Sequence, residues 1–286
     1  TGDAFIFTSP PKVFTYEINT GYSVDVNTHA RYKTAVIANR RLFVGNVYQG
    51  GVAHGDRMLS SPPNKFDLLP ESNFIDVAVG DGDEIVKLES FADRLLQFKK
   101  RSLYVINVGG ELGTEFLESH HNNMGVENPS QTCSTEYGIA WVNAQGVFLY
   151  DGQAVTDLTR NKLKLTSSTT TTQTTGGPPD ALNVTESYVP LIGYNPKEKW
   201  LVVHPQSTTT DAEDVEAWIF DFKNNSWVYS QEFTVSNDLK TNMIWTGDNE
   251  LVFAGAVDGA NPAFYKYRDA GTAVPAIGKL EMRTKD

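Results

Sequence analysis

Short runs of apolar and β-branched residues, each bounded by Gly, Asn, Asp or Pro, occur along most of the 286-residue chain. Apolar residues seldom recur at i, i+3, i+4 and i+7 without interruption, so the pattern predicts almost no helix. Polar turns join many of the runs in pairs, which is typical of β-hairpins. A strand at 42–44 follows a turn at 39–41, and hairpins are predicted at 95–98 with 103–106, 139–142 with 147–150, 191–194 with 200–203, 217–222 with 227–229, and 243–245 with 251–253.

The spacing of the turns adds a longer period to this pattern. Successive turns lie near Arg40, Lys100, Gln145, Lys197 and Asp248, at intervals of roughly 45 to 60 residues. A four-stranded propeller blade uses about 40 to 50 residues, whereas a β-sandwich has strands every 8–12 residues or so without this longer period. We therefore predict an all-β chain, with residues 1–286 forming a single β-propeller body of five or six blades.

Polar segments interrupt the predicted strands. Residues 166–180 are rich in Thr and carry no large apolar side chain, so we expect an exposed loop, with a glycosylated stalk as the alternative. Residues 206–214 form a second polar insertion, and Pro62-Pro63 marks another between two turns. These segments are expected to extend from the propeller body.

Composition limits the class of protein. The content of 40% hydrophobic residues is sufficient for a core, and no apolar run approaches the roughly 20 residues of a membrane helix. The beginning of the chain has neither an initiator Met nor the features of a signal peptide, which suggests a processed chain or a piece of a longer one. Cys133 is the single cysteine, which excludes an internal disulfide and a multi-cysteine zinc site, and we expect a buried, inert thiol.

Charge argues against binding to nucleic acid over the whole surface. The chain has 24 Lys and Arg against 35 Asp and Glu, for a net charge of −11, whereas nucleic-acid binding by counterion release needs basic patches. Its most basic stretch, Lys99-Lys100-Arg101, is interpreted as a solvated hairpin tip, with a phosphate contact as the alternative. An acidic wall would nevertheless suit a passage through which DNA must slide, because it repels phosphates.

Motifs for metal binding and catalysis are mostly missing from the sequence. There is no phosphate-binding Gly-rich loop, no nucleophile elbow and no His-Glu-x-x-His motif. His120 and His121 are adjacent, so on a strand they would point to opposite faces and could not chelate one ion. Residues 81–84 (Asp-Gly-Asp-Glu) resemble the start of a calcium loop, but Ile85 stands where an oxygen ligand is required, and we predict a turn before a strand at 85–88.

Glycoside hydrolysis would require two carboxylates that converge at one site. Asp93, Asp151 and Asp221 are the candidates, but their spacing does not place them together, and the repeated sialidase box is absent. The five tryptophans are expected to pack in the core rather than to form a sugar platform; they are Trp141, Trp200, Trp218, Trp227 and Trp245. We therefore assign no catalytic, cofactor-binding or metal-binding residue and expect a protein that is not an enzyme.

The middle and last thirds of the chain contain segments in the order seen in bacteriophage tail propellers. These segments are 84–88, 91–98, 102–106, 138–141, 146–152, 155–159, 195–200, 217–222 and Trp227. Over roughly residues 84–286 the chain resembles the family of podovirus tail nozzles (tail tubular protein B) and of hubs that stabilise packaged DNA. Residues 278–286 resemble an exit strand that leads into a further sheet domain, which would make the chain the propeller part of a longer protein.

The resemblance implies a structural role in a virion tail, as a nozzle or head–tail hub made in the host cytoplasm. It implies a ring of copies of the chain, with neighbouring tail or adaptor proteins and with DNA that passes through without specific binding. It implies no cofactor, no membrane and no enzymatic site. The alternatives are a carbohydrate-binding or glycan-cleaving propeller in host recognition, which would bring two carboxylates and an exposed Trp to one mouth, and a protein-binding hub in a cell.

Overall fold

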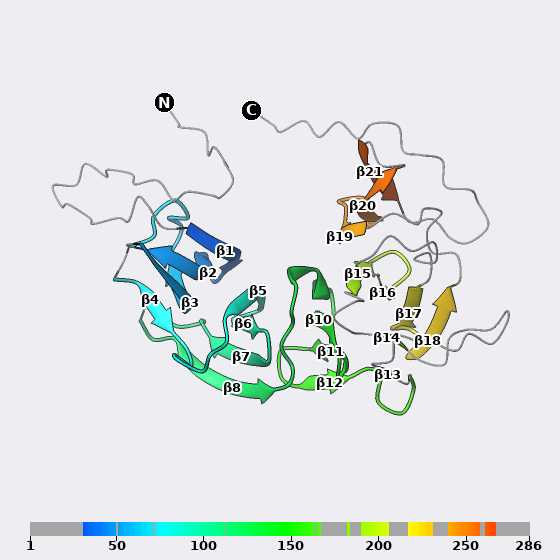
Figure 1. The fold of residues 1–286 in the computed structure, drawn as a ribbon, viewed down its shortest axis with the longest axis horizontal. Helices are drawn as coiled ribbons and strands as arrows, with labels where there is room; N and C mark the ends of the chain where they lie inside the picture. Colours follow the sequence, from blue (N-terminus) through cyan, green and yellow to red (C-terminus); the bar gives the residue numbers. More distant parts are fainter. Residues whose placement is uncertain are drawn as a thin grey trace. The chain divides into compact units, whose positions relative to one another are not determined.

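The computed structural model describes most of the chain between Arg31 and Lys266 (Figure 1). The described residues are 31–49, 51–70, 72–111, 113–163, 165–166, 182–183, 190–205, 217–230, 240–257 and 261–266. Contacts divide the chain into a first unit, Thr1–Pro129, and a second unit, Ser130–Asp286. The single propeller body over 1–286 stays a prediction.

The first unit contains two four-stranded antiparallel sheets whose strands follow the chain order. One sheet comprises β1 (Arg31–Ala38), β2 (Arg41–Gln49), β3 (Val52–Ser60) and β4 (Phe74–Asp76). The other comprises β5 (Ile85–Phe91), β6 (Arg94–Lys99), β7 (Ser102–Asn107) and β8 (Phe116–Asn122). Pro62 and Pro63 lie in the connection between β3 and β4, as the sequence predicts.

The second unit repeats this arrangement after a short 3-10 turn, η1 (Pro129–Gln131). Its first sheet contains β9 (Thr132–Thr135), β10 (Gly138–Asn143), β11 (Gly146–Tyr150) and β12 (Val155–Asp157). Its second contains β15 (Leu191–Asn195), β16 (Trp200–His204), β17 (Ala217–Asp221) and β18 (Ser226–Ser230). A three-stranded sheet contains β19 (Lys240–Trp245), β20 (Leu251–Val257) and β21 (Asn261–Lys266), and the short strands β13 (Leu165–Thr166) and β14 (Leu182–Asn183) pair in parallel.

The hairpins form where the sequence predicts them. At the β1–β2 tip Asn39 and Arg40 adopt φ values of 44° and 58°, the left-handed backbone that a tight two-residue hairpin needs. Lys199, Asn225 and Asn249 adopt positive φ at later tips. The all-β prediction is therefore confirmed, and the larger sheets begin about 50 residues apart along the chain, as expected for repeated four-stranded units.

In the first unit the two sheets pack face to face around one apolar cluster. Phe43 and Met58 come from the first sheet, and Ile85, Leu88 and Leu95 come from the second; all five are fully buried. Alternate residues on a strand face opposite sides, so β6 can contribute Leu95 to this cluster while Leu96 lies on its other face. Packing of this kind stabilises the pair of sheets by removing apolar surface from water.

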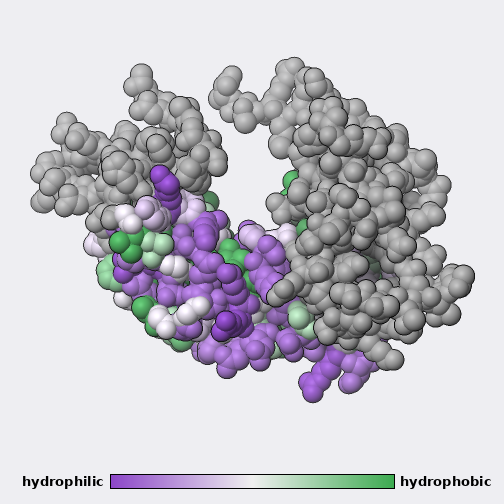
Figure 2. Space-filling view, in the orientation of Figure 1, coloured by the Kyte–Doolittle hydropathy of each residue, from purple (hydrophilic) through white to green (hydrophobic). Residues whose placement is uncertain are grey.

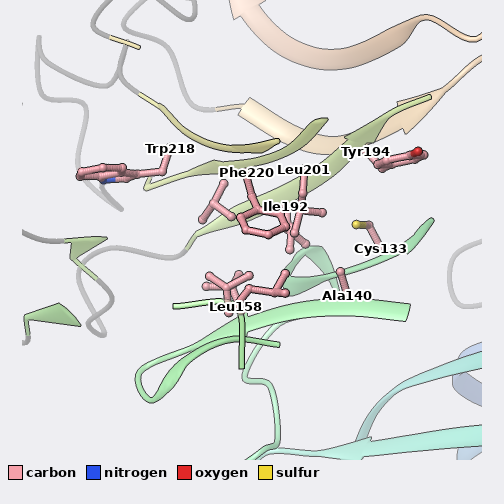
Figure 3. Close-up of a cluster of buried hydrophobic side chains, with 11 residues drawn as sticks. Cys133, Ala140, Leu158, Ile192, Tyr194, Leu201, Trp218 and Phe220 are labelled. Carbon is pink, nitrogen blue, oxygen red and sulfur yellow. The ribbon is translucent and has the colours of Figure 1, made fainter. Parts of the chain in front are cut away.

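In the second unit the β9–β12 sheet packs on one face of the β15–β18 sheet. Figure 3 shows Ile192, Leu201 and Phe220 between these sheets opposite Leu158, with Tyr194 and Trp218 toward opposite ends of the cluster. The other face of the β15–β18 sheet packs against β19 and β20 through a second apolar cluster.

Gly193 permits the close approach of β15 to β19 in that second cluster. A Cβ atom at this position would lie 2.4 Å from the Cβ of Met243, so even alanine would overlap with its neighbour. The absence of a side chain therefore sets how near the two sheets can come.

Some predictions fall on residues that are not described. They are the Thr-rich loop beyond Thr166, the insertion at 206–214, and the exit strand at 278–286.

Candidate functional site

A buried lysine connects the two sheets of the first unit. Lys99, at the end of β6, is fully buried, and its Nζ donates to Asp56 Oδ1 at 2.7 Å, to Asp81 Oδ2 at 2.9 Å and to the carbonyl of Ala78 at 3.0 Å. Burial alone would lower the pKa of Lys99, but the bonds to Asp56 and Asp81 outweigh it and the pKa is raised. The prediction of a solvated tip is therefore wrong for Lys99, whose ammonium is paired with two carboxylates. It holds for Lys100 and Arg101, which are exposed.

The ring of Tyr104 lies beside this lysine. Lys99 Nζ is 5.4 Å from the centroid of the Tyr104 ring, and the Tyr104 hydroxyl donates to Asp81 at 3.3 Å. His120 stacks on the same ring, with centroids 4.4 Å apart and an angle of 2° between the planes. His121 lies on the other face of β8 with its Nε2 3.1 Å from Ser119 Oγ, so the prediction that the two histidines face opposite ways is confirmed.

The residues that resemble a calcium loop form a turn before β5, as predicted. Asp83 accepts hydrogen bonds from the backbone N–H groups of Lys100 and Arg101, at 3.0 and 2.9 Å. Glu84 accepts bonds from Lys33 at 2.7 Å and from Asn46 at 2.9 Å, and it pairs with Lys100. These carboxylates therefore connect strands and turns of the first unit to one another.

An irregularity in the pairing of β2 with β3 lies at one of these contacts. The register of β2 against β3 shifts between Gly45 and Val47, and Asn46 has a φ of 58°. At this irregularity the Asn46 amide donates to Glu84 and, at 2.9 Å, to the carbonyl of Ile85 in the neighbouring sheet.

A second buried ion pair lies at the other end of the same two sheets. Arg41 begins β2 and pairs with Glu115, which precedes β8; their side chains are 1% and 6% exposed. Arg41 also donates to the carbonyl of Val108 at 2.8 Å, and Asn39 donates to that carbonyl at the same distance. Because buried charges require partners, this arrangement restricts how the sheets can stack.

The second unit gathers aromatic rings at one end of its sheets. Tyr137, in the β9–β10 turn, stacks on Phe222 with centroids 4.4 Å apart, and its ring meets Tyr194 edge to face at 6.3 Å. Phe222 begins the β17–β18 turn, and its N–H donates to the carbonyl of Lys199 in the β15–β16 turn. We call this group of three turns the aromatic end.

One carboxylate joins two of these turns. Glu136 accepts the Tyr194 hydroxyl at 2.8 Å and the Lys199 ammonium at 2.6 Å. The bond from Lys199, followed by that from Tyr194, lowers the pKa of Glu136. Burial, together with the bond to Glu136, raises the pKa of Tyr194 far above its ordinary value. Near neutral pH this end therefore holds an ionised carboxylate beside two neutral phenols.

The candidate glycosidase carboxylates mainly cap turns. Asp151 accepts the N–H groups of Gln153 and Ala154, both at 2.8 Å, and Asp221 accepts the N–H of Lys223 at 2.8 Å. Asp93 belongs to the first unit, where it occupies the β5–β6 turn. The structure brings only Asp221 to the aromatic end, where its charge acts on Tyr137.

The five tryptophans all lie in strands, but they are not all in the core. Trp141 is fully buried against Phe148, and Trp227 donates its indole N–H to the carbonyl of Leu158 at 2.9 Å. Trp245 is 49% exposed, so the prediction of core packing is wrong for it; its neighbour Ile244 is 54% exposed as well, so both faces of β19 are open to solvent at this end. Cys133 is buried in the apolar cluster of the second unit, as expected.

The sequence interpretation missed the aromatic end and the buried ion pairs. Tyr137 and Glu136 stand in an ordinary turn, and their partners Phe222 and Lys199 come from distant parts of the chain. The buried role of Lys99 was hidden because its two carboxylate partners come from other strands and turns. Local sequence carried no signal for either contact.

On the face shown in Figure 2, the described surface of the first unit is largely hydrophilic, with hydrophobic residues in small separate groups. Among the described residues, no helix has both the length and the apolar character needed to cross a membrane. Within the described ranges, no three His, Cys, Asp or Glu side chains are grouped so that they could hold a metal ion.

Comparison with known proteins identifies the fold but no family. No protein-family model matches the chain, and no curated protein matches it significantly. The extracellular domain of BT4673 from B. thetaiotaomicron matches over 91% of this chain and 29% of its own length, with 12% identity and a TM-score of 0.52. Raptor from Chaetomium thermophilum matches over 85% of this chain and 21% of its own length, with 8% identity and a TM-score of 0.46. YCF48 from Cyanidioschyzon merolae matches over 90% of this chain and 72% of its own length, with 7% identity and a TM-score of 0.46.

The likeness to the BT4673 domain shows a shared all-β fold and nothing about activity. The chain spans less than a third of the BT4673 domain that it matches.

Proposed function

We propose that the chain is a structural β-propeller of five or six blades from a bacteriophage tail, in a nozzle or head–tail hub. In this role it assembles with copies of itself in a ring, contacts neighbouring tail or adaptor proteins, and forms part of the conduit through which DNA leaves the virion. The proposal includes no catalytic step and no cofactor.

The repeated four-stranded sheet is the observation that carries the proposal. Four sheets of this kind occur among the described residues, each with its strands in chain order. Contacts between neighbouring sheets of a unit involve their first strands, since β1 meets β5, β9 meets β15, and β15 meets β19. Sheets that converge at their first strands are the arrangement expected of propeller blades around an axis.

The contacts between sheets support a mechanical role. In the first unit Arg41 with Glu115 and Lys99 with Asp56 cross from one sheet to the other in addition to the apolar cluster. Directional bonds of this kind resist sliding of one sheet over the next, which apolar contacts alone oppose less. A conduit wall under internal pressure needs that resistance.

The phage assignment itself rests on the sequence resemblance over 84–286 and on the acidic charge of the chain. A net charge of −11 suits a wall that DNA slides past, because the wall repels phosphates. One observation, the aromatic end, favours the glycan-binding alternative.

The decisive measurement is the mass of the native assembly of the full chain, by mass photometry and native mass spectrometry at several ionic strengths. A closed ring of defined copy number supports the proposal, and negative-stain images of that species should show a central opening. A monomer at every concentration would overturn the ring. Turnover in a panel of reporter glycosides would overturn the structural role and favour the glycan-cleaving alternative.

A further inference from the structure

The aromatic end of the second unit has the features of a binding site that the structural role does not use. It is formed by the β9–β10 turn, the β15–β16 turn and the β17–β18 turn. Tyr137 is 39% exposed, whereas Tyr194, which meets its ring edge to face, is 2% exposed. One aromatic ring is therefore presented to solvent while others hold it from behind.

Contacts with neighbouring aromatic rings fix the orientation of the Tyr137 ring in the absence of a ligand. Phe222 stacks on it at 4.4 Å with 21° between the planes, and Phe222 itself meets Phe220 of the core edge to face at 5.2 Å. A ring held in this way loses little freedom on binding, which favours affinity.

Polar groups lie around this ring in positions that are already fixed. Glu136 is held by Tyr194 and Lys199, and Asp221 is held by the N–H groups of its own turn. Carboxylate oxygens supply acceptors and the Lys199 ammonium supplies donors. A ligand that bears several hydroxyl groups could use both kinds.

Charge at the aromatic end favours an uncharged ligand. Residues 136–137, 196–199 and 221–225 together carry three carboxylates and three ammonium groups, although the whole chain has a net charge of −11. A strongly cationic or anionic ligand would gain little from this balanced surface. An aromatic ring beside neutralised donors and acceptors suits a sugar, whose C–H face is apolar and whose edge is polar.

Cleavage of a sugar is not favoured by the same groups. Glu136 already accepts two side-chain bonds, and its lowered pKa keeps it ionised near neutral pH, so it would not serve as a general acid. Asp221 is bonded to its own turn by the backbone of Lys223.

We propose that the aromatic end binds a neutral pyranose unit of a glycan without cleaving it, with the sugar stacked on Tyr137 and its hydroxyls bonded by Glu136 and Lys199. This inference does not depend on the ring-forming role, and either could fail while the other stands. In a tail protein such a site would let the particle adhere to a host surface glycan.

Calorimetric titration of the full chain with maltohexaose, cellohexaose and chitohexaose tests the proposal, with sialyllactose as the charged probe. At least one neutral oligosaccharide should bind with a dissociation constant on the order of 1 mM or tighter. Tyr137→Ala should weaken that binding about tenfold, and Tyr137→Phe, which keeps the ring, should remain within about threefold of the original. Tyr48→Ala is the matched control, because Tyr48 is 42% exposed and lies in the first unit.

A second variant guards against misfolding of Tyr137→Ala. Lys199→Met keeps the aromatic stack and removes a donor, so it should weaken binding severalfold while leaving tryptophan fluorescence unchanged. Failure of all three neutral sugars to bind at about 10 mM would overturn the proposal. So would binding of sialyllactose alone, binding unaffected by Tyr137→Ala, or release of reducing ends from any bound sugar.

Discussion

The two units join their sheets by different means. In the first unit, charged side chains cross between the sheets at both ends of the apolar cluster, and two of them, Arg41 and Lys99, are fully buried. In the second unit the space between the β9–β12 and β15–β18 sheets is filled by large apolar and aromatic side chains (Figure 3), among them Phe220. Its ion pair between Glu136 and Lys199 lies at the exposed end.

The two kinds of contact between sheets have different consequences for the stability of a unit and for the arrangement of its sheets. Apolar contacts stabilise roughly in proportion to the area buried and tolerate small shifts. Buried ion pairs add little net stability over apolar replacements, but a partner left unpaired is costly, so they favour one arrangement of the two sheets. We therefore expect the two sheets of the first unit to hold a more precisely defined arrangement. The second unit should draw more of its stability from apolar packing.

The largest effect is expected for Phe220→Ala in the second unit. Phe220 is 2% exposed and contacts Trp227 and Phe222, so its truncation leaves a cavity and should lower the free energy of unfolding by about 3–5 kcal/mol. All five tryptophans lie in this unit, so denaturation followed by tryptophan fluorescence measures it. Val228→Ala, at a valine of the same unit that is 54% exposed, is the control and should cost less than about 1 kcal/mol. Equal losses of unfolding free energy for the two variants would contradict the conclusion that apolar packing holds the sheets of the second unit together.

Arg41→Met should destabilise the first unit by a similar amount, about 3–5 kcal/mol, for a different reason. The variant leaves Glu115, whose side chain is 6% exposed, as an unpaired buried charge. Hydrogen exchange of peptides from β2 and β8 measures this unit, which contains no tryptophan.

The double variant Arg41→Met with Glu115→Leu separates the two kinds of joint. Removing both charges should restore most of the protection of β2 and β8 against hydrogen exchange, because the loss of stability in Arg41→Met comes from the unpaired Glu115. If the double variant is as unstable as the sum of the single ones, the pair stabilises the first unit directly, and the contrast with the second unit fails.

Gly193→Ala should have an intermediate effect on the second unit. Its new Cβ would lie 2.4 Å from the Cβ of Met243, so the sheets must shift, at a cost of about 1–3 kcal/mol. Gly247→Ala is the control, because no atom lies within 4 Å of a Cβ built there. A neutral Gly193→Ala would mean that β15 and β19 do not approach as closely as described.

How much of this could be predicted from sequence depends on the range of the interaction. The hairpins were predictable because Asn39 and Asn225 mark turns directly between apolar runs, and strand content follows from local residue preference. The partners of Lys99 and of Tyr137 were not, since each pairing joins segments far apart in the chain. Trp245 was assigned to the core because its neighbours are apolar, but whether other segments cover the end of a strand depends on contacts between distant parts of the chain.

The smallest effect concerns Glu84, which crosses between the sheets of the first unit near the surface. Hydrogen bonds from Lys33, Asn46 and Lys100 lower the pKa of Glu84 to about 2. A carboxyl whose pKa is lowered in the folded state stabilises that state above its ordinary pKa of 4.5, and this contribution disappears as the pH falls toward 2.

Protection of β1 and β5 against hydrogen exchange, corrected for the intrinsic rate, should therefore fall between pH 4.5 and about 2. In Glu84→Gln this fall should be shallower, whereas Glu111→Gln, at an exposed turn, should leave it unchanged. The effect at neutral pH should stay below about 1 kcal/mol, because the Lys33 and Glu84 side chains are 60% and 35% exposed and water screens the pair. An unaltered pH profile in Glu84→Gln would show that the Glu84 carboxylate does not help to hold the two sheets of the first unit together.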